Sequence, residues 1–310
     1  MANRTEQQIG ILYAAVAYVL WGVLPVYWKL LGDVGAEEIL ANRVIWSFVF
    51  MIGLLLLLKK WSLFLSTIQG FAKNKKQLVA LTIASVLISI NWFVYIWAVN
   101  SEQMIEASMG YYINPLVSVL LGILFFKEKL SPAQIVSFLF AIIGVLIMTF
   151  SYGSVPWIAL TLAISFGLYG MAKKLIKMDS AVGLALETMV VTPIAGIYLI
   201  FFVGTENSFI SDGWLTSLLL MGAGIATAVP LLFFAKGAQS IPLTMLGFLQ
   251  YIAPTITLIL GIFIYHESFT KTDLLAFTFI WAALTIFSLS KTKIASLLEV
   301  KMRKEKSTHI

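Results

Sequence analysis

Residues 112–131, YINPLVSVLLGILFFKEKLS, align without gaps to residues 251–270, YIAPTITLILGIFIYHESFT, at an offset of 139 positions. Apolar segments often share Leu and Ile, but agreement in Pro, Gly and Glu together is not expected by chance. The similarity therefore predicts an internal structural repeat. The shared frame pairs Tyr112 with Tyr251, Pro115 with Pro254, Gly122 with Gly261, Glu128 with Glu267, and Ser131 with Thr270.

The polar residues at the end of this frame have a local structural explanation. Glu128 and Glu267 fall in tight loops, and Ser131 and Thr270 follow three residues later, where each suits the N-cap of the next helix. Small residues are expected to permit close helix packing at Gly122, Gly261, Gly222, Gly224, Ala226 and Ala228.

The composition places most of the chain in lipid. Of its 310 residues, 60% are hydrophobic and 12% are charged, and the mean hydropathy is +0.94. Since a membrane-spanning helix needs roughly 20 apolar residues, the length accommodates about ten spans with short loops. We expect spans near 9–31, 38–58, 77–99, 105–126, 132–152, 156–175, 182–204, 214–237, 242–265 and 271–290. Prolines inside these spans, at Pro25, Pro115, Pro193, Pro230 and Pro254, should kink or locally open a helix.

Weaker similarity extends the repeat toward the start of each half. Trp21, Gly22 and Lys29 correspond to Phe166, Gly167 and Lys174 at an offset of 145 residues. The chain is therefore divided into a first repeat over residues 1–152, a second over 153–290, and a basic tail over 291–310. Because five spans is an odd number, the second half must enter the membrane from the opposite side. The predicted fold is an all-α membrane protein with ten transmembrane helices in two inverted five-helix repeats.

The distribution of Lys and Arg predicts the orientation. Cytoplasmic loops of membrane proteins are enriched in these residues. With the N-terminus inside, 18 of the 21 cations lie on the cytoplasmic side, and both termini are expected there. These cations are Arg4, Lys59, Lys60, Lys73, Lys75, Lys76, Lys127, Lys129, Lys173, Lys174, Lys177, Lys236, Lys291, Lys293, Lys301, Arg303, Lys304 and Lys306.

The segment over residues 61–72, WSLFLSTIQGFA, is expected to form an amphipathic helix that lies flat on the inner leaflet. Its apolar face would hold Trp61, Phe64, Leu65, Ile68 and Phe71. The cationic tail could likewise touch anionic lipid, or be frayed and solvated. Lysines near span ends are interpreted as anchors that extend toward the interface, namely Lys29, Lys173, Lys174 and Lys236.

Several classes of function are disfavoured by the residues present. The chain has no Cys, which excludes disulfides and Cys-ligated metals. His266 and His309 fall at a loop edge and in the tail, so a buried haem or a His-rich metal site is not expected. The basic residues flank apolar runs without forming a separate module, so no nucleic-acid partner is expected. We predict no cofactor, no metal and no catalytic residue.

Two ionisable residues lie inside predicted spans, where charges are costly and commonly functional. Arg43 lies about 8 Å from the outer end of its span, and Glu187 is similarly deep from the inner end of its own. Arg43 could bind a carboxylate or a phosphate, while Glu187 could bind an amine or carry a coupling proton. The alternative is a structural role, through an ion pair or buried hydrogen bonds.

Uncharged polar and aromatic residues form a second group of candidates. The amides could face a central polar cavity or make interhelical hydrogen bonds, and they are Asn91, Asn114 and Gln250. The aromatic residues could line the same cavity, or pack in the core or an interfacial belt, and they are Trp21, Trp92, Tyr112, Tyr169 and Tyr251.

The sequence resembles the EamA group of the drug/metabolite transporter superfamily, and the RarD family in particular, over nearly its whole length. The resemblance is carried by WGVLPVYWK at 21–29, EEILANRVIWS at 37–47, NWFVYIWAVN at 91–100, ASMGYYINPLVSVLLG at 107–122, FGLYGMAKK at 166–174, GLALETMVVTP at 183–193 and LGFLQYIAPT at 246–255. It implies a ten-span carrier of the bacterial inner membrane with two EamA-like repeats. RarD proteins have been associated with chloramphenicol sensitivity, but the resemblance supplies no substrate.

The leading functional hypothesis is a secondary active transporter of a small organic solute, such as a metabolite, an amino-acid-like compound or a drug, working by alternating access. Export is favoured by the family resemblance alone. No Walker motif is present to use ATP. The alternatives are a flippase for lipid headgroups, a receptor or assembly subunit that does not transport, and, with least support, an intramembrane enzyme. The expected partners are a small-molecule substrate and membrane lipid, and a homodimer is left open.

Overall fold

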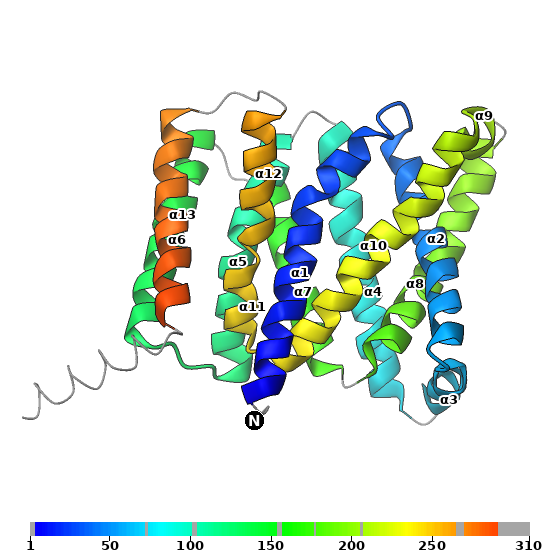
Figure 1. Cartoon of the computed structure of the whole chain (residues 1–310), viewed down its shortest axis with the longest axis horizontal. Helices are drawn as coiled ribbons and strands as arrows, with labels where there is room; N and C mark the ends of the chain where they lie inside the picture. The colour runs from blue at the N-terminus through cyan, green and yellow to red at the C-terminus, as the bar shows by residue number, and fades with distance from the viewer. Residues whose placement is uncertain are drawn as a thin grey trace, which may run out of the picture.

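The computed structural model describes residues 4–71, 74–100, 104–153, 157–176, 178–204, 207–264 and 270–290. Every regular element in these residues is a helix, and most of the helices stand side by side in one bundle (Figure 1). The helices are α1 (Arg4–Lys29), α2 (Ala36–Leu57), α3 (Trp61–Phe71), α4 (Lys75–Asn100), α5 (Met104–Phe126), α6 (Pro132–Tyr152), α7 (Trp157–Leu175), α8 (Ser180–Tyr198), α9 (Ser208–Ser211), α10 (Trp214–Ser240), α11 (Leu243–Leu249), α12 (Ile252–Phe263) and α13 (Lys271–Ser290), with a π-helix η1 (Leu199–Val203) after α8.

Nine helical segments among the described residues are long and apolar enough to cross a membrane. A further apolar segment, Gly110–Phe126 within α5, is shorter. The predicted ninth span is not one continuous helix, because α11 ends at Leu249 and α12 begins at Ile252. Pro254 offers no N–H to the carbonyl of Gln250, which weakens helical continuity at this point. The regular helix is therefore interrupted at Gln250 and Tyr251, just before Pro254, although both residues keep αR backbone angles.

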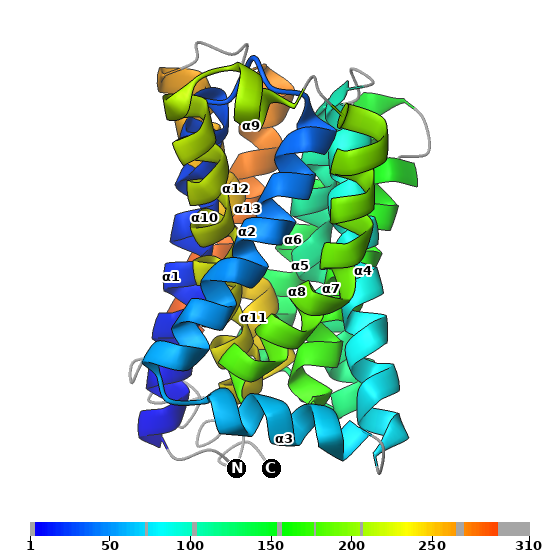
Figure 2. The same ribbon diagram turned by 90° about the vertical axis from the view of Figure 1, so that its right-hand side faces the viewer.

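The bundle has two distinct ends. α1 begins and α13 ends at one of them, which we call the basal end, and α9 lies at the other, the apical end (Figures 1 and 2). Lys29 and Lys271 lie at apical helix ends. The other described lysines belong to basal loops and helix ends, and they are Lys59, Lys60, Lys75, Lys76, Lys127, Lys129, Lys173, Lys174 and Lys236.

Helix α3 forms where the amphipathic segment predicts it, and it runs across the basal end, transverse to the bundle (Figure 2). Phe64 and Phe71 are buried, whereas Trp61 and Leu65 are exposed. The predicted apolar face is thus shared between contact with the bundle and the surface, which suits a helix lying at a membrane interface.

The outer surface of the bundle is rich in apolar side chains. Phe150, Phe201 and Ile194 are 78%, 76% and 68% exposed, and many other large aliphatic and aromatic residues project outward from the helices. A water-soluble protein rarely exposes contiguous apolar patches on this scale. Lipid is the solvent that matches such a surface.

Both predicted N-caps are confirmed. The Ser131 hydroxyl accepts a hydrogen bond from the Gln134 N–H, and the Gln134 side chain accepts one from the Ser131 N–H. Thr270 and Asp273 exchange the equivalent pair of hydrogen bonds at the start of α13. These reciprocal bonds satisfy amides that a helix start leaves without intrahelical partners.

Glu128 has a long-range role beyond the loop in which it was predicted. Its two carboxylate oxygens accept hydrogen bonds from the backbone N–H groups of Leu243 and Thr244, each at 2.8 Å. The loop after α5 therefore caps the start of α11, in the other half of the chain. Glu267, the corresponding residue of the second half, lies outside the described residues.

A second link joins the two halves at the basal end. Lys60, before α3, forms an ion pair with Asp179 at 2.5 Å. Asp179 also accepts hydrogen bonds from the N–H groups of Ala181 and Val182 at the start of α8. Partial burial acts to raise the pKa of Asp179, but the Lys60 ammonium and these N–H groups outweigh it and leave the pKa below its ordinary value.

The predicted close packing is confirmed at Gly224, where α10 crosses α2. A Cβ atom built on Gly224 would lie less than 3.0 Å from backbone atoms of Trp46 and Ser47. The Ser47 hydroxyl donates to the Gly224 carbonyl at 3.0 Å. The absence of a side chain at Gly224 thus sets the separation of two helices, and this crossing lies next to the candidate site.

Candidate functional site

Arg43 projects from the apical half of α2 toward three other helices. Its Nε atom donates a hydrogen bond to the Thr227 hydroxyl of α10 at 3.0 Å. Its Cζ atom lies 4.9 Å from the ring centroid of Trp28 in α1 and 4.9 Å from that of Trp92 in α4. Indole faces are the best aromatic partners for a cation. We call Arg43, Trp28, Trp92 and Thr227 the arginine cluster.

None of the ion pairs found among the described side chains includes Arg43. Within the same residues, Arg43 donates one side-chain hydrogen bond, to Thr227. The side chain is half-buried. The cluster therefore holds a half-buried arginine between two indole rings, and within the described part of the chain only its Nε–H has an acceptor.

Glu187, unlike Arg43, forms an ion pair within the chain. One carboxylate oxygen is 2.7 Å from the Lys173 ammonium, and the other accepts a hydrogen bond from the Tyr169 hydroxyl at 3.1 Å. The two charged side chains are 4% and 3% exposed. The interpretation of Lys173 as an interfacial anchor is therefore wrong. Its place in the last turn of α7 suggested an exposed end, but α8 packs over it.

Tyr112 and Tyr251, which occupy matching places in the repeated frame, lie together in the structure. The Tyr251 hydroxyl donates to the Tyr112 carbonyl at 3.3 Å, and the Tyr112 hydroxyl donates to the Pro254 carbonyl at 3.3 Å. Both rings are buried. They join α5 to the segment between α11 and α12.

Gln250 sits between α11 and α12, and its amide donates to the Ser118 hydroxyl of α5 at 3.0 Å. Asn114 lies one turn before Ser118 and is buried. Its side-chain oxygen has no hydrogen-bond partner within the described part of the chain. Buried polar atoms are usually paired, so this oxygen marks a polar spot in the middle of the bundle.

The remaining candidates take part in packing between helices. The Asn91 amide donates to the Leu162 carbonyl at 2.9 Å and to the Ser165 hydroxyl at 3.0 Å, which joins α4 to α7. Trp21 contacts Phe166 and Phe234 at centroid distances of 5.8 and 5.6 Å. The structure thus gives these two residues neighbours in the core.

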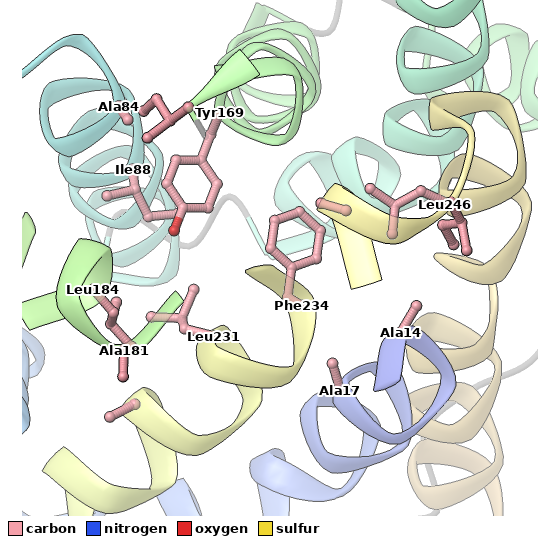
Figure 3. Packing of buried hydrophobic residues seen from close by; sticks show 14 of the residues in the cluster. Ala14, Ala17, Ala84, Ile88, Tyr169, Ala181, Leu184, Leu231, Phe234 and Leu246 are labelled. Atoms are coloured by element: carbon pink, nitrogen blue, oxygen red, sulfur yellow. The ribbon is translucent and has the colours of Figure 1, made fainter. Parts of the chain in front are cut away.

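The Tyr169 ring continues the same aromatic packing. It stacks on Phe234 with centroids 5.8 Å apart. Figure 3 shows these two rings side by side between α7 and α10, with Ala14 and Ala17 of α1 nearby.

The contacts of the sequence candidates fall into several groups. Arg43 and Trp92 come together in the arginine cluster, and Glu187 and Tyr169 lie next to Lys173. Tyr112 and Tyr251 lie at the interruption between α11 and α12. Across the described ranges, no group of three or more His, Cys, Asp or Glu residues is placed to hold a metal ion.

The contacts of Trp28 and Thr227 with Arg43, and of Lys173 with Glu187, were not predicted from the sequence. Trp28 stands beside Lys29 at a span end, where an interfacial belt is the ordinary interpretation. Thr227 is 184 residues from Arg43, and no local pattern connects them. Lys173 could have been noticed because it lies four residues after Tyr169, on the same face of α7.

A helical bundle with an apolar surface and charged groups in its interior is a multi-pass integral membrane protein. A sequence model of the family described as "EamA-like transporter family" matches residues 8–150 and again residues 154–289. The chain belongs to this family. It is a multi-pass transporter of the bacterial inner membrane, as the predicted resemblance to RarD proteins indicates.

Individual relatives agree with this placement. The chain is 52% identical over 291 residues to the "Uncharacterized transporter YojE" of Bacillus subtilis, covering 94% of this chain and 97% of that protein. It is 42% identical over 287 residues to the "Protein RarD" of Escherichia coli, covering 92% and 95%. A solved crystal structure aligns with a TM-score of 0.68 at 17% identity, covering 90% of this chain and 97% of the other, which shows the fold alone. Relatives named as transporters point to a small-molecule substrate and a non-enzymatic role.

Proposed function

We propose that the chain is a secondary active transporter that exports a small organic solute by alternating access. Ten crossings would form two inverted halves, residues 1–152 and 153–290, with both termini in the cytoplasm. The excess of lysines at the basal end supports a cytoplasmic basal end. The family model that matches twice supports the division into halves.

The observation that carries the proposal is that helix contacts recur when the halves are exchanged. If α1 corresponds to α7, α4 to α10, and α5 to α11 with α12, then the contact of α1 with α10 corresponds to that of α7 with α4. Both contacts are present. The contact of α1 with α12 likewise corresponds to that of α7 with α5, and again both are present. If α6 corresponds to α13, exchanging the halves leaves the contact between these two helices unchanged, and this contact is present.

The recurrence reaches individual atoms. A Cβ on Gly22 would lie 2.7 Å from Ile256, and a Cβ on Gly167 would lie 2.7 Å from Val117. The two glycines are 145 residues apart and their two partners are 139 apart, which are the offsets of the sequence repeats. Two halves of similar shape and opposite direction can exchange inward-open and outward-open forms by rocking around a site between them.

A cross-link at the basal end tests this mechanism. Lys60 and Asp179 join the two halves, and alternating access requires this end to open. Untargeted metabolite profiling first identifies solutes whose export requires expression of the wild-type protein. In the Lys60→Cys/Asp179→Cys variant, a short bifunctional thiol reagent is expected to stop the export of these solutes. The chain has no native Cys, so each single-cysteine variant is a matched control and should stay active with the reagent. Full export by the cross-linked double variant would contradict alternating access.

A further inference from the structure

We propose that the arginine cluster binds the carboxylate group of the solute, and that the substrates are small organic carboxylates with an apolar or aromatic portion. That these carboxylates are transported substrates rests on the proposed transport function. Binding at Arg43 does not, and it can be measured separately.

The position of the cluster suits a ligand site between the halves. Arg43 comes from α2 and its neighbours Trp28 and Trp92 come from α1 and α4, all in the first half, while Thr227 comes from α10 in the second. A solute held there would contact both halves and would sense their relative movement.

The residues of the second half that correspond to Arg43 and Trp28 are Glu187 and Lys173, and they form a charge-compensated pair. Arg43 and Glu187 are 144 residues apart, and Trp28 and Lys173 are 145 apart. Where Lys173 neutralises Glu187, the corresponding residue Trp28 offers Arg43 an aromatic face. Cation–π contacts offset part of the desolvation of a buried cation, but they supply no negative charge. An anion is therefore the missing partner of the arginine cluster.

The donor geometry selects a planar, singly charged group. Nε is used by Thr227, which leaves the N–H groups of the two terminal nitrogens. These can bind the two oxygens of a carboxylate in parallel. A phosphate monoester carries about 1.5 to 2 negative charges at neutral pH, which one guanidinium would not neutralise in a low-dielectric interior. The neighbouring indole rings of Trp28 and Trp92 suit an apolar or aromatic remainder.

The test compares carboxylates with their neutral amides on the purified full-length protein in detergent. The probes are acetate with acetamide, benzoate with benzamide, and cyclohexanecarboxylate with its amide, and binding is followed by ligand-detected NMR. At least one carboxylate should bind, and bind more tightly than its amide by roughly tenfold, which corresponds to 1.4 kcal/mol. This arm needs no variant and therefore does not depend on the folding of one.

Variants then locate the site. Arg43→Gln should weaken carboxylate binding by roughly tenfold or more, and Arg43→Lys should also weaken it because the planar fork is lost. Thr227→Val should weaken it less, because it frees Nε from its acceptor without removing the charge. Lys236→Gln is the matched control, since Lys236 is an exposed cation 4.9 Å from the Tyr13 ring, outside the cluster.

The outcomes separate this inference from the proposed function. Carboxylate binding that is lost in Arg43→Gln and kept in Lys236→Gln supports the inference. It is overturned if no probe carboxylate binds the wild type, if the amides bind equally well, if inorganic phosphate competes as the better ligand, or if folded Arg43→Gln binds normally. Arg43-dependent binding without any wild-type-dependent export would instead overturn the transport function and leave the site standing.

Discussion

Replacing Lys173 with methionine is expected to lower the free energy of unfolding by about 3–5 kcal/mol. Glu187 would lose the ammonium 2.7 Å away. Tyr169 would be left as its hydrogen-bond donor. With both members of the pair almost fully buried, water cannot replace the missing partner.

The double variant Lys173→Met/Glu187→Met identifies the cause. Removing both charges from a buried pair is often neutral or stabilising, because the desolvation of both ions is avoided. Unfolding by denaturing detergent in mixed micelles should therefore find the double variant more stable than Lys173→Met. Lys236→Met, which removes an exposed cation, should stay close to the wild type. Equal stability of the single and double variants would show that the pair is not the source of the loss.

Replacing Gly224 with alanine is expected to abolish most solute export and Arg43-dependent binding. The new methyl group would fall within 3.0 Å of the backbone of Trp46 and Ser47, and backbone atoms cannot turn aside as a flexible side chain can. α2 and α10 must then move apart. Thr227 lies three residues along α10 and would move away from Arg43, with overpacking alone costing about 1–3 kcal/mol.

Gly53→Ala is the matched control for this substitution. Gly53 is also in a long helix, α2, but a Cβ atom there would meet nothing within 4 Å. Because alanine is the better helix former by about 1 kcal/mol, this change should preserve or raise stability. Export and binding should be measured at equal membrane levels of both variants. Gly224→Ala behaving like Gly53→Ala would mean that the helix crossing does not position the arginine cluster.

Most of the fold could be predicted from the sequence, because lipid exposure leaves long apolar runs and caps leave local signatures. The amphipathic helix α3 and the caps at Ser131 and Thr270 follow from residues within one or two turns. The capping of α11 by Glu128 could not be predicted, because its partners are 115 and 116 residues away.

The candidate site could be predicted only in part. The burial of an ionisable residue within an apolar run marked Arg43 and Glu187, since such groups are rare in membranes. Whether each charge is compensated depends on side chains brought by other helices. Lys173 forms an ion pair with Glu187, whereas Arg43 contacts Trp28 and Thr227 and belongs to no ion pair found among the described side chains.

The most direct measurement is untargeted metabolite export from cells that express the wild type, Arg43→Gln or Lys236→Gln at matched membrane levels. We predict one or more small organic carboxylates whose export follows the wild type and Lys236→Gln and falls by roughly tenfold or more in Arg43→Gln, as expected for loss of a charge-assisted bidentate contact. A transporter centred on the arginine cluster would be contradicted if export were the same in Arg43→Gln as in the wild type. It would also be contradicted if no solute were exported only by cells that express the wild type.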